Sequence, residues 1–191
     1  IIFFSTPFDS TAVDFLERLD VPVYKIASFE LGDWELLRDV ARTGKPVILS
    51  TGMASEIEIA EALDCLRGSG SGEVALLKCT SAYPAPPTSM NLGAIPYLSE
   101  TFDVVAGLSD HTLGIAAPVA ATALGASIIE KHVTLSRDLP GPDSAFSLEP
   151  SEFKEMVRNV RATEQAVAGS KLGPTDAEQG SLVFRRSLFV T

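Results

Sequence analysis

Six short apolar runs recur along the chain, and each ends in polar residues before a segment with helical periodicity. The runs are IIFFSTP (1–7), VPVYKIAS (21–28), PVILSTG (46–52), EVALLKCTS (73–81), VVAGLSDH (104–111) and ASIIEKHVT (126–134). Near-continuous Val, Ile and Leu is typical of strands buried on both faces of a parallel sheet. The pattern therefore predicts six parallel strands separated by helices.

Capping residues and apolar stripes predict a helix after each run. Asp9 or Ser10 can cap the first helix, Ser55 and Glu58 have the spacing of a capping box, and Pro150 opens the last helix. The predicted helices cover 11–19, 34–43, 56–67, 91–100, 114–124 and 151–168. The remaining tail has turn residues and a basic pair without helical periodicity, which predicts a linker.

Strand–helix alternation of this kind indicates an α/β fold with right-handed crossovers. An open doubly wound sheet and a (β/α)8 TIM barrel both fit the pattern. Polar residues end every run, which favours the barrel, because an open sheet concentrates such residues at its switch point. A complete barrel needs eight strands and typically ~250 residues. The 191-residue chain is therefore expected to hold a barrel that is about two βα units short.

Composition narrows the class of protein further. Hydrophobic residues make up 46% of the chain and charged residues 21%, an ordinary globular balance. The net charge of −10 argues against extensive binding to nucleic-acid phosphates. No apolar run approaches the ~20 residues of a membrane-spanning helix. Cys65 and Cys79 form no disulfide framework, so we expect reduced thiols and a cytoplasmic protein.

Three of the six lysines (Lys25, Lys78 and Lys131) lie at the polar ends of the runs, among many hydroxyl groups. Against the acidic background, this clustering predicts a local anion site, because ammonium and hydroxyl groups both donate to phosphoryl oxygens. Each group has a simpler alternative. A serine or threonine at a strand end often caps the next helix, and a lysine such as Lys78 often extends to solvent.

The chain has two histidines, His111 and His132, at the ends of consecutive runs. A lone histidine is more often a hydrogen-bonded structural residue than a metal ligand. Two imidazoles on neighbouring strands, with carboxylates nearby, can hold a divalent transition metal with positions open for substrate. If the strands are not neighbours, the two histidines are unrelated.

Long motifs in the runs resemble the sialic acid synthase family of phosphoenolpyruvate-dependent nonulosonate synthases. The motifs are FSTPFD (4–9), YKIASFE (24–30), ILSTGMA (48–54), LLKCTSAYPAP (76–86), GLSDHT (107–112) and IEKHVTL (129–135). The resemblance implies a TIM barrel, with residues 1–169 covering about strands three to eight. Residues 170–191 would be a linker toward an antifreeze-like (SAF) C-terminal domain that the sequence does not include.

The resemblance also implies roles for individual residues. His111 and His132 would hold a divalent metal, manganese or magnesium, and Glu30 would act as general acid or base near the sugar. Phosphoenolpyruvate would be bound by Thr6, Lys25, Ser28, Ser50 and Ser109. Tyr83 and Asp143, together with Glu30, would contact the sugar. The family's enzymes are homodimeric transferases that form a carbon–carbon bond between phosphoenolpyruvate and an N-acetylated hexose.

Two features of the motifs bear on the sugar. Ser81 stands where N-acetylneuraminate synthases usually carry Asn, and GPDSAFSLEP (141–150) is similar to the pseudaminic acid synthases of the family. This predicts a 2,4-diacetamido-2,4,6-trideoxy-altrose acceptor. N-acetylneuraminate or legionaminate synthesis is the alternative, and a catalytically inactive, ligand-binding remnant is the second. The metal is expected to polarise the sugar aldehyde as a Lewis acid.

Overall fold

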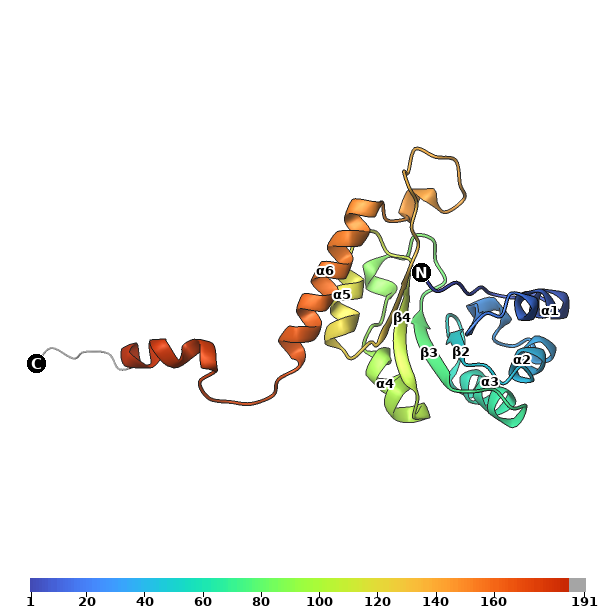
Figure 1. Cartoon of the computed structure of the whole chain (residues 1–191), viewed down its shortest axis with the longest axis horizontal. Helices are drawn as coiled ribbons and strands as arrows, with labels where there is room; N and C mark the ends of the chain where they lie inside the picture. The colour runs from blue at the N-terminus through green and yellow to red at the C-terminus, as the bar shows by residue number, and fades with distance from the viewer. Residues whose placement is uncertain (186–191) are drawn as a thin grey trace, which may run out of the picture.

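A computed structural model describes residues 1–185 and shows a curled, five-stranded parallel sheet with helices packed against it (Figure 1). Each strand pairs with the next one in the sequence, in the order β1-β2-β3-β4-β5. The strands are β1 (Tyr24–Ile26), β2 (Val47–Ser50), β3 (Val74–Cys79), β4 (Val105–Asp110) and β5 (Ile128–Lys131). The α/β prediction is confirmed, and the curled sheet agrees with part of a TIM barrel. The assignment to barrel strands three to eight stays a prediction.

One predicted strand is wrong. Residues 1–7 are not assigned to a strand, although the Lys25 N–H donates to the Ser5 carbonyl at 3.2 Å. A strand requires a ladder of such bonds. This single bond is the only backbone hydrogen bond between residues 1–7 and β1, so the run lies beside β1 without regular pairing.

The helices begin close to where their caps predict. The helices are α1 (Ser10–Arg18), α2 (Trp34–Ala41), α3 (Glu56–Gly68), α4 (Ala94–Phe102), α5 (Ala116–Ala123) and α6 (Pro150–Val167), with short 3₁₀ turns η1 (Ser28–Glu30), η2 (Pro87–Ser89) and η3 (Ser144–Phe146). Asp9 is the cap of α1, since its carboxylate accepts from the Ala12 N–H at 2.8 Å. Ser55 and Glu58 form the predicted capping box of α3. None of the helices in residues 1–185 is both long and apolar enough to span a membrane.

The tail differs from the prediction in one respect. It contains a 3₁₀ segment, η4 (Asp176–Phe184), which begins at a capping box formed by Thr175 and Glu178. The Thr-x-x-Glu spacing is a helix-start signal, and it explains why a turn of helix forms here without an apolar stripe. Residues 170–185 are all exposed, and Figure 1 shows them extending away from the sheet and its helices. Residues 186–191, the rest of the predicted linker, lie outside the described residues.

Alternation along the strands divides their side chains between two environments. One set packs with the helices in a single hydrophobic core. From the strands it contains Tyr24, Ile26, Val47, Leu49, Val74, Leu76, Ala106 and Leu108. The residues between these point to the opposite, concave side of the sheet, where polar groups gather at the carboxyl ends of the strands.

Candidate active site

A cavity of about 350 Å³ opens at the carboxyl ends of the strands. Every strand, or the residues directly after it, contributes to its wall. The lining residues are Thr6, Lys25, Ala27, Ser28, Ser50, Cys79, Tyr83, Ser109, His111, Glu130, Lys131 and His132. All residues predicted to bind phosphoenolpyruvate, both histidines and Tyr83 are therefore in one place. Their chemical roles stay predictions.

Lys25 provides the ammonium of this cavity. Its side chain is buried, and Nζ donates to Ser50 Oγ at 2.7 Å and to the Ile26 carbonyl at 2.9 Å. Burial lowers the pKa of Lys25 below its ordinary value, and the Glu130 carboxylate, 3.7 Å from Nζ, opposes this shift. The ammonium is thus held rigidly at the wall, with capacity to donate to a bound anion.

Hydroxyl groups surround the ammonium on neighbouring strands. Ser28 Oγ accepts a hydrogen bond from the Gly52 N–H at 2.9 Å, and Ser109 Oγ donates to Glu130 Oε1 at 2.6 Å. Glu130 therefore connects Ser109 with Lys25 across the cavity. Glu130 stands at the polar end of the run 126–134, although the sequence motifs predict no role for it in the site.

The predicted cluster of three lysines is only partly correct. The Lys78 ammonium donates to the Cys79 carbonyl at 2.7 Å and to Thr80 Oγ1 at 3.3 Å, and the residue lines a different cavity, between α3 and α4. Lys131 forms a buried ion pair with Asp110. Lys78 and Lys131 belong to the alternation set that faces the helices. Lys131 still lines part of the cavity, but its ammonium is engaged by Asp110 and by the Thr112 carbonyl.

The two imidazoles do come together. The ring centroids of His111 and His132 are 5.3 Å apart, and the Tyr83 ring lies 4.2 Å from that of His111. Burial alone would lower the pKa of His111, but hydrogen bonds to Cys79 and to the Thr80 carbonyl give a net rise. Burial and the neighbouring His111 lower the pKa of His132.

The geometry fits a metal held by these two residues. The Nδ1 atom of His111 lies 3.0 Å from the Thr80 carbonyl oxygen, which fixes a proton on Nδ1 and leaves Nε2 as the free ligand atom. Within residues 1–185, no cluster of three or more His, Cys, Asp or Glu side chains is arranged to hold a metal. The two imidazoles are therefore the residues that would hold a metal at this edge, and the metal itself stays a prediction.

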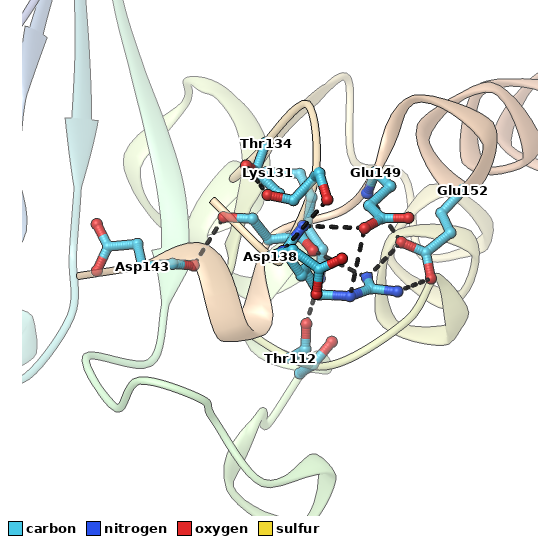
Figure 2. A network of polar contacts seen from close by, with 10 residues as sticks. Thr112, Lys131, Thr134, Asp138, Asp143, Glu149 and Glu152 are labelled. Atoms are coloured by element: carbon cyan, nitrogen blue, oxygen red, sulfur yellow. Dashed lines mark hydrogen bonds and ion pairs between the residues drawn. The ribbon is translucent and has the colours of Figure 1, made fainter. Parts of the chain in front are cut away.

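Glu30 and Asp143 do not line the cavity. Glu30 ends η1, and its Oε2 atom is buried without a hydrogen-bond partner among the described residues. Asp143 stands on the loop after β5, with Oδ2 3.8 Å from His132 Nδ1. Figure 2 shows its side chain directed away from the ion pairs of Glu149 and Glu152, which lie at the start of α6 and pair with Arg137. Both carboxylates lie at the margin of the site rather than in its wall.

Cys79 is a lining residue that the sequence analysis did not place in the site. Its thiol lies 3.9 Å from Ser81 Oγ. Burial opposes ionisation of this thiol, but hydrogen bonds from His111 and Ser28 give a net lowering of its pKa. Cys79 follows Leu77 by two residues on β3, and alternate residues of a strand share a face. This alternation was the signal that could have placed Cys79 on the concave face.

A curled parallel α/β sheet, with an ammonium, several hydroxyls and paired imidazoles at its carboxyl edge, is the arrangement of a barrel-type domain with its polar site at that edge. Comparison with known proteins identifies which one: the chain belongs to the NeuB family, whose model matches residues 1–171. The family inferred from the sequence motifs is thereby confirmed.

Individual relatives agree with this assignment. The chain is 45% identical over 189 residues to pseudaminic acid synthase of Helicobacter pylori, which covers 98% of this chain and 55% of that protein. It is 42% identical over 191 residues to N,N'-diacetyllegionaminic acid synthase of Campylobacter jejuni, with 98% and 57% covered. The crystal structure of N-acetylneuraminic acid synthetase from Leptospira borgpetersenii matches with a TM-score of 0.88 and 39% identity, over 98% of this chain and 66% of that one. The chain thus spans little more than half the length of these two curated relatives.

Proposed function

We propose that this chain carries the active site of a synthase that condenses phosphoenolpyruvate with an N-acetylated hexose to give a nine-carbon 2-keto acid and phosphate. The observation that carries the proposal is the single cavity that combines the Lys25 ammonium, the strand-end hydroxyls and the two imidazoles. Family membership and the names of the relatives support it.

Lys25 and the hydroxyls would bind the anionic substrate. The phosphate and carboxylate of phosphoenolpyruvate are acceptors, whereas ammonium and hydroxyl groups donate. Ser50 and the Ile26 carbonyl hold Nζ of Lys25 in place, so little ordering of this side chain remains to be done on binding. Lys25 would also stabilise the charge that develops on phosphate as it departs.

The sugar would occupy the part of the cavity beside Tyr83, with its aldehyde toward the imidazoles. A divalent manganese or magnesium ion, held by His111 and His132, would supply Lewis-acid polarisation of the aldehyde oxygen when bound. Glu30 is the proposed proton-transfer group, because its buried Oε2 atom has no hydrogen-bond partner among the described residues. An unpartnered buried carboxylate oxygen is costly, and a substrate hydroxyl would satisfy it.

In the proposed condensation, the π bond between carbons 2 and 3 of phosphoenolpyruvate supplies the electron pair for a new bond from carbon 3 to the aldehyde carbon, and the aldehyde oxygen takes a proton to become a hydroxyl. The oxygen of one water molecule bonds to carbon 2, and one of the two water protons is released. The bond between carbon 2 and the bridging oxygen then breaks, phosphate leaves with that oxygen and takes the second water proton, and a keto group remains at carbon 2.

The preferred acceptor is proposed to be 2,4-diacetamido-2,4,6-trideoxy-altrose, with pseudaminic acid as product. The loop GPDSAFSLEP and Ser81 support this choice. The identities of 45% to a pseudaminic acid synthase and 42% to a legionaminic acid synthase are too close to decide it. Legionaminate or N-acetylneuraminate synthesis is therefore the alternative that the experiment must test.

The test incubates the full-length protein that carries this chain with manganese, phosphoenolpyruvate and each candidate sugar in turn, and follows phosphate release and product mass. We expect turnover with the altrose derivative and its loss in His111→Ala. Faster turnover with another sugar would change the assigned product. Binding of phosphoenolpyruvate without turnover on any sugar would instead favour a ligand-binding remnant.

A further inference from the structure

The two strands that carry the histidines are joined by a buried ion pair on the side of the sheet opposite the concave face. Asp110 and Lys131 stand opposite one another in the register of β4 and β5. The Lys131 Nζ atom lies 2.6 Å from Asp110 Oδ2, and the two side chains are 1% and 0% exposed, respectively. Each residue directly precedes a histidine of the cavity.

Thr112 completes this network with all of its polar groups. Its N–H donates to Asp110 Oδ1 at 2.9 Å, its hydroxyl donates to Asp110 Oδ2 at 3.1 Å, and its carbonyl accepts from Lys131 Nζ. In Figure 2 a dashed line runs from Thr112 into the cluster of side chains that includes Lys131. Both neighbours of His111 are therefore bound to one ammonium, and that ammonium belongs to the residue before His132.

Stability does not account for such a pair. Removing two charges from water offsets most of their attraction, and replacing a buried pair by apolar groups is often neutral or stabilising. The place of the ion pair, between the two strands that carry the histidines, accounts for it better. On the concave face, Ser109 and Glu130 join the same two strands by a 2.6 Å hydrogen bond, so the segments that present the imidazoles are tied on both faces.

We propose that Asp110, Lys131 and Thr112 are positioning residues that set the separation and orientation of the His111 and His132 rings. That the two rings hold a metal is part of the function proposed above, and the inference rests on it in this respect. Partners that hydrogen-bond a metal-ligating histidine typically change metal affinity about 10–100-fold when they are removed. That range is the reference for the effect expected here, which reaches the rings through the backbone.

The test uses the double variant Asp110→Asn/Lys131→Met. Each single change would leave one charge buried and unpaired, which destabilises a fold by itself, whereas the double change removes both charges. Thr112→Val is a second, milder variant that deletes one hydroxyl and keeps the ion pair. Lys45→Met is the matched control, because Lys45 pairs with Glu17 at 2.8 Å before the amino end of β2, far along the strand from the cavity.

Two readouts are needed besides thermal unfolding. The chain contains two histidines, so selective histidine labelling gives two sets of ring signals in an NMR spectrum. These signals report ring environment in the metal-free protein. Titration with Mn²⁺ alone then gives the metal affinity.

We expect the double variant to unfold near the wild-type temperature, with shifted and broadened ring signals and a manganese affinity lower by about 10–100-fold. Thr112→Val should change both readouts in the same direction by less, and Lys45→Met should change neither. If the double variant folds and its ring signals are those of the wild type, the proposal is overturned. It is also overturned if the double variant does not fold and Thr112→Val gives wild-type ring signals. If the wild-type chain binds no manganese, the metal site of the proposed function fails, while the ring signals still decide the positioning role.

Discussion

The Lys25 ammonium is the group on which the proposed anion site depends most. Its position is determined by neutral acceptors, Ser50 Oγ and the Ile26 carbonyl, while Glu130 stands 3.7 Å away as a weaker, charged contact. An entering phosphate can therefore bind Nζ without first breaking a short ion pair. This arrangement would let a chain with a net charge of −10 bind the anionic substrate proposed for it.

Lys25→Met tests this cation directly. A hydrogen bond to a charged group contributes about 1.5–3 kcal/mol, so we expect phosphoenolpyruvate affinity to fall about 10–100-fold by isothermal titration calorimetry. Lys45→Met is the control, because it removes an ammonium from the opposite end of the sheet and should leave affinity unchanged. Equal affinity in Lys25→Met and wild type would remove Lys25 from the site.

The pH dependence of binding follows from the same environment. Burial lowers the pKa of Lys25, and Glu130 partly opposes the shift. Only the protonated amine attracts phosphate, so affinity is complete below the lowered pKa and is lost as pH rises through it. Glu130→Gln removes the opposing charge and should move this alkaline loss to still lower pH. Calorimetric titrations of both proteins from neutral to alkaline pH measure the shift, and a shift to higher pH would contradict the assignment.

The residues that the sequence analysis misplaced share one physical cause. Run ends could be read from the sequence, and the structure brings Lys25, Ser109 and both histidines, which stand at such ends, to one cavity. The face on which each side chain lies depends on whether its position along the strand is odd or even, because successive side chains alternate between the two faces. Within IEKH, Glu130 and His132 have the same phase and Lys131 has the other. Applying that alternation would have brought Glu130 into the site and directed the Lys131 ammonium toward Asp110 on the other face.

At the scale of elements, the close approach of β4 and β5 depends on a glycine. Gly107 pairs with Ile128 in the register, and a Cβ at this position would lie 2.7 Å from Leu77 Cδ2 and closer still to the Ile128 carbonyl oxygen. A backbone oxygen cannot move aside cheaply. The glycine therefore permits the spacing of the two strands that deliver the histidines.

Gly107→Ala should push these strands apart. Overpacking of this kind costs typically about 1–3 kcal/mol, so we expect a lower free energy of unfolding in urea and a weaker manganese affinity. Gly32→Ala is the matched control, since a Cβ there meets nothing within 4 Å. An unchanged urea midpoint in Gly107→Ala would show that the strand pair can absorb the methyl group.

Elements with local signals were predictable, and elements that depend on distant partners were not. The capping boxes and the Asp9 cap act within one turn, so helix starts follow from neighbouring residues. The run 1–7 has the composition of a strand, but pairing is a property of two segments. With one backbone bond to β1, through Ser5, it stays irregular.

For the whole molecule, strand order is what assembles the site. Each strand pairs in parallel with its successor, so all carboxyl ends lie at one edge, and Thr6 and His132, far apart in the sequence, line the same cavity. The order was foreseeable from repeated right-handed crossovers. The curl of the sheet, which brings the lining groups around one cavity, is a property of several twisted strands together and could not be read from any single run.

The boundary between this domain and its tail gives the last prediction. Residues 170–185 are all exposed, and their backbone hydrogen bonds connect only residues of the tail itself. Elements without buried contacts contribute little to the global free energy of unfolding. Chains ending at residue 169 and at residue 185 should therefore have the same melting temperature and the same phosphoenolpyruvate affinity, measured by calorimetry. The longer truncation product is the necessary control, because it isolates the contribution of 170–185 from that of the last six residues. A lower melting temperature for the shorter chain would show that the tail packs on the sheet and its helices, and the domain boundary at 169 would then be wrong.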